Sequence, residues 1–326
     1  MLSVSNQLVV FLDIIIVNWN TGNQLRECLE SIATANQAGF SLNRVVVVDN
    51  MSADDSLEGL DDLDLPLILI KNKENVGFAA ACNQGAKGSR SDYLLFLNPD
   101  TRLFEDSLRL IVSFMQRPEN EKIGICGIQL VDERGSVSRT CSRFPTPLMF
   151  FSKMLGLDRL FPRYFPSHFM SEWDHGETRE LDHVIGAFFF VRRSLFKRLG
   201  GFDQRFFVYL EDLDFSLRAR LSGWRSFYLA NAQAYHKGGG SSELVKATRL
   251  FYSLRSRILY GYKHFGWFSA TFLMAGTLFL EPLCRLALAI IGRRSVMEAK
   301  ETIKGYAMLW CAIPELFRNT LDNGRQ

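Results

Sequence analysis

Three carboxylates lie close together in residues 206–218, where an apolar run leads into Glu211, Asp212 and Asp214. Carboxyl groups beside apolar residues are partly withdrawn from water, which raises their pKa and suits one of them to accept a proton. Helical spacing places Asp214 one turn before Arg218 and directs Asp212 away from that pair. The stretch therefore predicts either a general base or the ordinary acidic start of a helix, where carboxylates are favoured by the helix dipole.

Further polar residues follow four short apolar runs in the first hundred residues. The runs are 13–17, 45–48, 68–70 and 93–97, and such runs are typical of strands buried on both faces. A helix with one apolar face is expected over 24–35, so strands and helices alternate as in a doubly wound, mostly parallel α/β sheet. The polar residues after the four runs are, in order, Asn18 and Asn20; Asp49, Asn50 and Ser52; Asn75 and Gly77; and Asn98 and Asp100.

In an open α/β sheet the ligand crevice lies beyond the carboxyl ends of the strands, which is where these polar residues are expected. The first strand-to-helix turn carries neither a GxGxxG nor a P-loop motif, so a bound nucleotide would be held by carboxylate and amide side chains. Asp49 is placed to accept from a base or ribose. Asp100 is placed to ligate a divalent cation on a diphosphate. Both residues also suit ordinary turns.

The second half of the chain is less regular. Strands are expected over 123–130, 184–191 and 224–229, with the small residues Gly186 and Ala187 permitting close approach of a ligand. The aromatic-rich segment 150–175 is expected to be a flap near an acceptor. His236 precedes a Gly/Ser run at 238–242 that suits a loop closing over phosphates, although a lone histidine is more often structural.

Composition excludes some classes of function. The 326 residues are 47% hydrophobic with a net charge of +3. From residue 244 onward there are twelve Lys and Arg against five Asp and Glu, which favours an anionic membrane surface as a partner and not nucleic acid. The six cysteines lack metal-ligand spacing and indicate reduced thiols in a cytosolic compartment. The apolar run 8–17 contains Asp13 and follows no basic region, so no signal peptide is expected.

Residues 265–291 are nearly continuously apolar and are long enough to span a bilayer. Glu281 and Arg285 interrupt the segment at a spacing that allows them to pair, and Pro282 would kink a helix. Basic residues occur on both sides of the segment, which fits a helix or hairpin lying in the interface better than a span. A packed helical subdomain is the alternative.

Taken in order, the motifs resemble those of family 2 glycosyltransferases with the GT-A fold, and most of all bacterial rhamnosyltransferases of O-antigen and cell-wall glycan assembly. The resemblance covers roughly residues 13–242. Its motifs are VNWN (17–20), VVDNMS (47–52), NVGFA (75–79), FLNPD (96–100), GA (186–187), GGFD (200–203), FF (206–207), YLEDLD (209–214) and His236.

The resemblance implies a GT-A domain over 1–243, with a Rossmann-like nucleotide-sugar half at about 1–130 and an acceptor half at about 131–243. Residues 244–326 would form a helical, membrane-associating region. Asp100 and His236 would hold Mg²⁺ or Mn²⁺, with Asn98 in place of the first acid of the family's DXD motif. The implied donor-binding residues are Asn18, Asn20, Asp49, Asn50, Ser52, Asn75, Gly77, Asn98 and Asp100.

On the acceptor side, Asp212 would be the general base and Glu211 would support it or contact the acceptor. Gly186, Ala187 and Tyr209 would also face the acceptor. His183 stands where relatives often carry an aromatic residue, usually Trp.

The resemblance implies inverting transfer of L-rhamnose from dTDP-L-rhamnose to a glycan or polyprenyl-diphosphate-linked acceptor. We expect the protein at the cytoplasmic face of the inner (plasma) membrane, peripheral or monotopic. Two alternatives are another UDP- or dTDP-sugar donor such as galactofuranose, and a catalytically silent glycan-assembly subunit.

Overall fold

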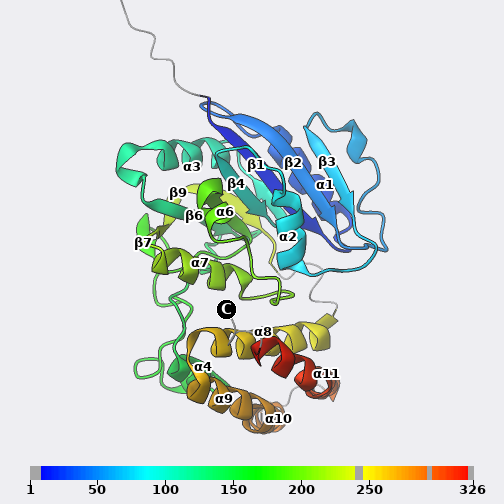
Figure 1. Cartoon of the computed structure of the whole chain (residues 1–326), viewed down its shortest axis with the longest axis vertical. Helices are drawn as coiled ribbons and strands as arrows, with labels where there is room; N and C mark the ends of the chain where they lie inside the picture. Colours follow the sequence, from blue (N-terminus) through cyan, green and yellow to red (C-terminus); the bar gives the residue numbers. More distant parts are fainter. Residues whose placement is uncertain (1–8, 239–244, 292–295, 322–326) are drawn as a thin grey trace, which may run out of the picture.

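The computed structural model describes residues 9–238, 245–291 and 296–321, which form a mixed sheet with helices on both faces and a helical unit below it (Figure 1). The strand order is β3-β2-β1-β4-β8-β6-β9-β5, with β7 paired to β9. The strands are β1 (Phe11–Asn18), β2 (Ser41–Asp49), β3 (Leu67–Lys71), β4 (Tyr93–Leu97), β5 (Thr101–Leu103), β6 (Ile123–Val131), β7 (Arg179–Leu181), β8 (Phe188–Arg192) and β9 (Arg225–His236).

Alternation along the central strands divides the sheet core into two layers. Ile14 and Ile16 pack with α1 (Asn23–Ala33) and α3 (Ser107–Gln116), whereas Ile15 and Val17 pack on the opposite face. Because side chains alternate between the faces of a strand, a continuous apolar run is required to bury both sides. The helices of the second layer are α2 (Phe78–Ala86), α6 (Arg193–Arg198) and α7 (Glu211–Leu221).

The expected parallel pairing is correct for β3, β2, β1 and β4 and for β6 with β9, but the other pairs of the second half are antiparallel. Strand β8 lies antiparallel between β4 and β6, and β5 and β7 are antiparallel to β9. A buried apolar run predicts a strand but carries no information on its direction. The sheet is therefore a mixed α/β sheet.

Three boundaries also differ from expectation. Residues 184–187 are not a strand; Gly186 and Ala187 form a turn, and β8 begins at Phe188. Strand β9 continues past the expected end at 229 and reaches His236, since its second half pairs with β5 and β6. The expected flap 150–175 begins with two short helices, α4 (Pro147–Met154) and α5 (Leu157–Leu160).

The C-terminal part is helical where it is described. It contains α8 (Lys246–His264), α9 (Trp267–Ala275), a π-helical turn (Gly276–Leu280), α10 (Glu281–Ile291) and α11 (Val296–Leu321). One continuous helical stretch, Trp267–Ala287, is long and apolar enough to cross a membrane by length and composition. The core of this unit includes Phe206 and Leu213, so the helical unit packs directly against the start of α7.

Candidate active site

Helix α7 begins with the three carboxylates, and the backbone just before it is strained. Tyr209 and Leu210 have φ values of 70° and 66°, in the left-handed region that side chains other than glycine rarely occupy. Such conformations cost about 1–3 kcal/mol each and are concentrated at functional sites. Successive residues of an α-helix point about 100° apart, so Glu211 and Asp212 at the start of α7 face different surroundings.

The Asp212 carboxylate is held by three neighbours. Its Oδ2 accepts from the Gly186 N–H at 2.7 Å, and its Oδ1 accepts from the Leu213 N–H at 2.8 Å. The Nε2 of His183 lies 3.5 Å from Oδ2, and Nδ1 of the same ring lies 3.0 Å from the Ser216 hydroxyl. Burial alone would raise the pKa of Asp212, but His183 and the N–H donors hold it below its ordinary value. Asp212 is therefore ionised at neutral pH.

Glu211 has the opposite environment. Its side chain is buried, and its Oε2 has no hydrogen-bond partner among the residues that the structure describes. Burial, together with the nearby Asp212 charge, raises the pKa of Glu211 well above its ordinary value. Asp212 is thus an ionised carboxylate and Glu211 a neutral carboxylic acid. Acid–base sites often contain two carboxyl groups in these opposite protonation states.

Gly186 and Ala187 connect Asp212 to the turn after β4. While the Gly186 N–H binds Asp212, the Ala187 carbonyl accepts from the Asn98 N–H at 3.0 Å. A Cβ on Gly186 would lie 2.9 Å from Asp212 Oδ2, which explains why glycine is needed here. In this structure both residues position other groups; whether they also face an acceptor stays a prediction.

The residues after β1 and β2 form one buried polar cluster. The Asn18 amide donates to Asp49 Oδ1 at 2.8 Å and to the hydroxyls of Ser52 and Ser56. Asp49 Oδ2 accepts from the Ser52 N–H at 3.1 Å, and the Ser52 hydroxyl accepts from the Asn20 N–H at 3.0 Å. The amide of Asn18 is fully engaged in holding this loop, which fits a positioning role.

The loop after β3 joins this cluster to the segment before α7. The Asn50 amide donates to the Gly77 carbonyl at 3.3 Å, and Asn75 Oδ1 accepts from the Gly77 N–H at 3.0 Å. Gly77 has φ of 85°, and a Cβ there would lie 2.6 Å from the Phe207 carbonyl oxygen. Close backbone contact therefore brings 75–77 and the start of α7 together.

Asp100 and His236 are brought together by the pairing of β5 with β9. The Nε2 of His236 lies 3.3 Å from Asp100 Oδ1, and both side chains are about nine-tenths buried. Asp100 lines a cavity of about 220 Å³ together with Gln24, Glu27, Arg102, Glu133, Tyr235 and Lys237. No group of three or more His, Cys, Asp or Glu within the described part of the chain has metal-binding geometry. The expected Gly/Ser loop at 238–242 lies, apart from Gly238, outside the described residues.

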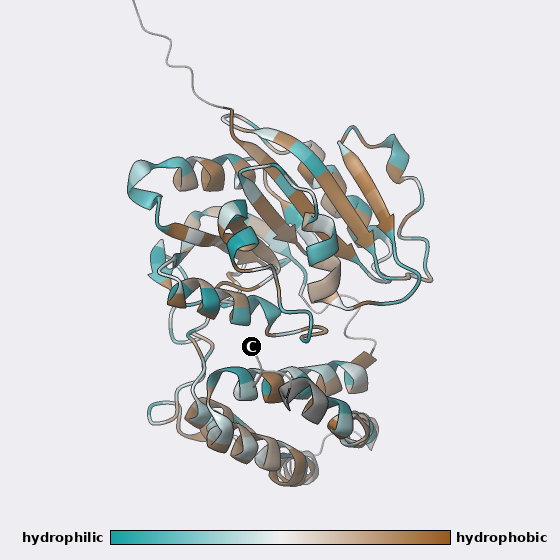
Figure 2. Ribbon diagram, in the orientation of Figure 1, coloured by the Kyte–Doolittle hydropathy of each residue, from teal (hydrophilic) through white to brown (hydrophobic). Residues whose placement is uncertain are grey.

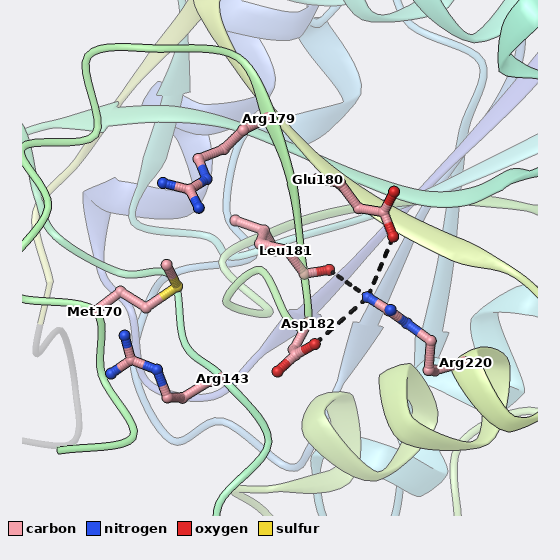
Figure 3. Close-up of a pocket in the computed structure, with 7 residues that line it drawn as sticks. All are labelled: Arg143, Met170, Arg179, Glu180, Leu181, Asp182 and Arg220. Carbon is pink, nitrogen blue, oxygen red and sulfur yellow. Dashed lines mark hydrogen bonds and ion pairs between the residues drawn. The ribbon is translucent and has the colours of Figure 1, made fainter. Parts of the chain in front are cut away.

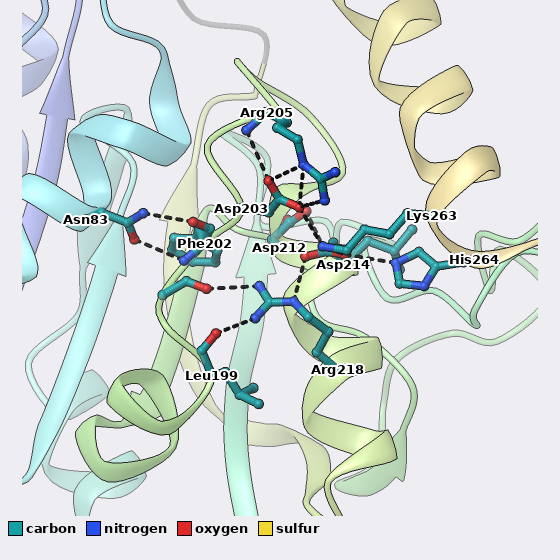
Figure 4. Close-up of polar contacts among 12 residues, drawn as sticks. Asn83, Leu199, Phe202, Asp203, Arg205, Asp212, Asp214, Arg218, Lys263 and His264 are labelled. Atoms are coloured by element: carbon teal, nitrogen blue, oxygen red, sulfur yellow. Dashed lines mark hydrogen bonds and ion pairs between the residues drawn. The ribbon is translucent and has the colours of Figure 1, made fainter. Parts of the chain in front are cut away.

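Asp214 belongs to a buried ion network that sequence reasoning missed (Figure 4). It is fully buried and pairs with Arg218 at 2.8 Å, as the helical spacing predicted. From the end of α8, Lys263 and His264 approach the other oxygen of Asp214 at 2.7 and 2.8 Å. Lys263 also bonds Asp203 at 2.6 Å. The helical unit is thus tied to α7 two residues beyond Asp212, over a sequence separation that no local pattern reveals.

A separate pocket lies at the far end of α7 (Figure 3). Arg220 spans it, with its guanidinium 3.1 Å from the Leu181 carbonyl and 3.4 Å from both Asp182 and Glu180. The volume is about 440 Å³, and the lining is completed by Arg143, Met170 and Arg179. Its charges are already paired within the protein, so we assign it no part in the chemistry.

The fold is that of an α/β enzyme, and its polar clusters lie at the carboxyl ends of the parallel strands, where such sheets bind their ligands. The chain belongs to glycosyl transferase family 2, whose model matches residues 13–200, and it is a glycosyltransferase. The resemblance expected from the motifs is confirmed.

Two curated relatives are named rhamnosyltransferases. The chain is 26% identical over 272 residues to the N-acetylglucosaminyl-diphospho-decaprenol L-rhamnosyltransferase of Mycobacterium tuberculosis, covering 79% of this chain and 87% of the relative. It is 28% identical over 234 residues to rhamnosyltransferase WbbL of Escherichia coli K12, covering 68% and 82%.

A solved structure also has a similar fold. The mannosyltransferase PcManGT from Pyrobaculum calidifontis, in complex with GDP-Man and Mn²⁺, has a TM-score of 0.52 at 18% identity, covering 94% of this chain and 82% of its own. The mixed α/β sheet is consistent with the expected GT-A fold.

Proposed function

We propose that the protein is an inverting rhamnosyltransferase that moves L-rhamnose from dTDP-L-rhamnose to a glycan or polyprenyl-diphosphate-linked acceptor. The two relatives named as rhamnosyltransferases support the sugar, and the name of one supports the lipid-linked acceptor. The observation that carries the mechanism is the Gly186–Ala187 turn, which bonds Asp212 on one side and Asn98 on the other.

Asp212 is the general base of this proposal. It is ionised and fixed by two backbone N–H groups, so it is ready to accept the proton of an acceptor hydroxyl. The hydroxyl oxygen forms a bond to the anomeric carbon while the bond from that carbon to the diphosphate breaks on the opposite face, which inverts the configuration. A neutral Glu211 adds no second negative charge beside the base.

The donor nucleoside would bind over the polar cluster after β1, β2 and β3. Asp49 would accept from the base or ribose, with Asn18 and Ser52 holding its carboxylate in place. Asn20 and Asn50 would add amide contacts, and the loop at 75–77 would close the pocket toward α7.

Asp100 and His236 fit a divalent cation. A carboxylate oxygen and an imidazole nitrogen face one another at 3.3 Å, and a diphosphate can supply further oxygen ligands to Mg²⁺ or Mn²⁺. When bound, such a cation would neutralise charge on the leaving diphosphate. The turn at Asn98, fixed through Ala187, sets the position of Asp100 relative to the base.

The acceptor would approach between the strained turn at Tyr209 and the Gly186–Ala187 turn. A lipid-linked acceptor requires work at a membrane, so we place the protein at the cytoplasmic face of the inner membrane. The apolar stretch Trp267–Ala287 and the basic C-terminal part support this location.

A calorimetric titration of the purified protein against sugar nucleotides, with and without Mn²⁺, tests the proposal. We expect tightest binding of dTDP-L-rhamnose, strengthened by Mn²⁺ in the wild type and unaffected by Mn²⁺ in Asp100→Ala. Preference for a UDP-sugar such as UDP-galactofuranose would change the donor and keep the mechanism. Absence of binding to any nucleotide would refute the proposal in favour of a silent assembly subunit.

A further inference from the structure

The helices α9 and α10 present an apolar surface that the described residues of the protein do not cover. Trp267, Phe268 and Phe272 are 66%, 81% and 73% exposed, and Phe279 in the π-helical turn and Leu283 in α10 are 60% and 65% exposed. Figure 2 shows these helices at the end of the molecule remote from β1–β3. Large aromatic side chains exposed together mark an interaction site, because isolated exposure is common but contiguous exposure is rare in soluble monomers.

Two other elements extend this surface, which we call the apolar end. Helix α4 packs against α9, where the rings of Phe151 and Phe272 lie 6.3 Å apart. From α11, the ring of Trp310 contacts that of Phe279 at 5.1 Å and is itself 43% exposed. The segment that begins with α4 adds further exposed side chains at 39–79%, namely Leu148, Leu155, Leu160, Phe161 and Tyr164.

The charge of these segments favours an anionic partner. Residues 147–164 and 267–287 together contain four basic residues, Lys153, Arg159, Arg163 and Arg285, against only two acidic ones. One of the acids, Glu281, is 2% exposed and is paired inside the protein with Arg257. Exposed aromatic groups surrounded by cations are the composition of an interfacial membrane segment.

The inner side of the same helices is polar and fixed to α8. Thr277 is fully buried and accepts from Arg257 Nη2 at 2.9 Å, and one turn later Glu281 pairs with Arg257 as well. Arg285 approaches Glu281 at 2.8 Å. A helix spanning a bilayer would have to carry this ion cluster through the hydrocarbon, where charges are costly.

Contacts between α8 and α11 determine how the apolar stretch Trp267–Ala287 can lie relative to a membrane. These helices lie before and after the apolar stretch, yet they pack along one another (Figure 1). Glu301 Oε2 accepts from the Ala247 N–H at 3.0 Å, and Arg255 pairs with Glu315 at 3.0 Å. A single spanning helix between them would place α8 and α11 on opposite sides of the membrane and break these contacts.

We infer that the apolar end lies in the plane of an anionic lipid surface and does not cross it, with the outer sides of α4, α9 and α10 facing the lipid. This inference rests on the proposed function, because a lipid-linked acceptor is what would bring the protein to a membrane. The contacts of Lys263 with Asp214 and Asp203 then link the docked unit to the catalytic helix.

Vesicle sedimentation of the full chain tests the surface. The wild type should bind phosphatidylcholine vesicles that contain phosphatidylglycerol, and bind less at high salt. The combined substitutions Phe268→Ser, Phe272→Ser and Phe279→Ser should weaken binding by at least about tenfold. Leu221→Ser is the matched control, since Leu221 is 75% exposed on α7. Equal binding by the triple variant and the wild type, or equal loss in the control, would overturn the inference.

Labelling with a membrane-impermeant maleimide tests the orientation. In protein bound to sealed vesicles and carrying Ser at Cys284 and Cys311, both Lys246→Cys on α8 and Lys300→Cys on α11 should react from outside. Reaction at only one of them would show a span and overturn the in-plane orientation. Because sugar-nucleotide binding is measured without lipid, its loss would refute the proposed function separately from the docking surface.

Discussion

Replacing Gly186 by Ala tests whether the position of the Asp212 carboxylate governs the reaction. The added Cβ would lie 2.9 Å from Asp212 Oδ2, whereas ordinary contacts begin at 3.4 Å, so the carboxylate must move by the difference of about 0.5 Å. The same shift stretches the 2.7 Å bond from the Gly186 N–H. Since a displacement of about 1 Å can cost about 100-fold in rate, we expect kcat to fall by about tenfold, or about 1.4 kcal/mol of barrier.

The assay is transfer from radiolabelled dTDP-L-rhamnose at saturating donor and acceptor, with donor affinity measured separately. Donor affinity should be unchanged, because Gly186 contacts Asp212 and not the polar cluster at Asn18, Asp49 and Ser52 to which we assign nucleoside binding. Gly176→Ala is the control, since a Cβ there meets only the Asp174 side chain, at 3.3 Å or more. A Gly186→Ala enzyme that melts like the wild type and turns over at the wild-type rate would refute this reasoning.

Two further substitutions test the electrostatics of α7. His183→Phe removes the group that lowers the pKa of Asp212, so the acid limb of the kcat/KM pH profile, where the base is lost by protonation, should move to higher pH; an unmoved limb would exclude the contact. Asp214→Ala removes the buried carboxylate that pairs with Arg218, Lys263 and His264, of which Lys263 keeps its contact with Asp203. The loss should cost about 3–5 kcal/mol in urea unfolding, whereas the exposed Glu30→Gln should cost little. Burial raises the pKa of Asp214, but His264, Arg218 and Lys263 together bring it below its ordinary value. The stability that Asp214 contributes is therefore present above the unfolded pKa and is lost as the pH falls toward the folded pKa. An equal loss of stability in Asp214→Ala and Glu30→Gln, or a wild-type stability that does not change with pH in acid, would contradict this.

The strands at the centre of the sheet could be predicted because each is a continuous apolar run, which is sufficient to indicate burial on both faces. The run at 93–97 coincides with β4, and the runs at 13–17 and 45–48 lie within β1 and β2. A strand covered on both faces needs continuous apolar residues, and few other elements require so short a run. The polar residues that end these strands lie at one edge of the sheet, as expected.

The second half of the sheet could not be predicted in the same way, because its strands and turns depend on partners distant in sequence. The latter part of β9 has alternating small and polar residues, and it is a strand because β5 and β6 bond it on both sides. Gly186 and Ala187 form a turn because Asp212 and Asn98 bind its backbone, a requirement invisible in the apolar pattern around them. Likewise, nothing local to Lys263 and His264 indicates that they reach Asp214, 49 and 50 residues earlier.

The most direct test of the account is the transfer rate of Asp212→Asn with dTDP-L-rhamnose and a polyprenyl-diphosphate-linked acceptor, beside its affinity for the donor. Asparagine keeps an oxygen for the Gly186 N–H but cannot accept the proton. If Asp212 is the general base, kcat should fall by about 10²–10⁴-fold while donor affinity stays within about twofold of the wild type. Transfer near the wild-type rate would contradict Asp212 as the base and with it the proposed mechanism.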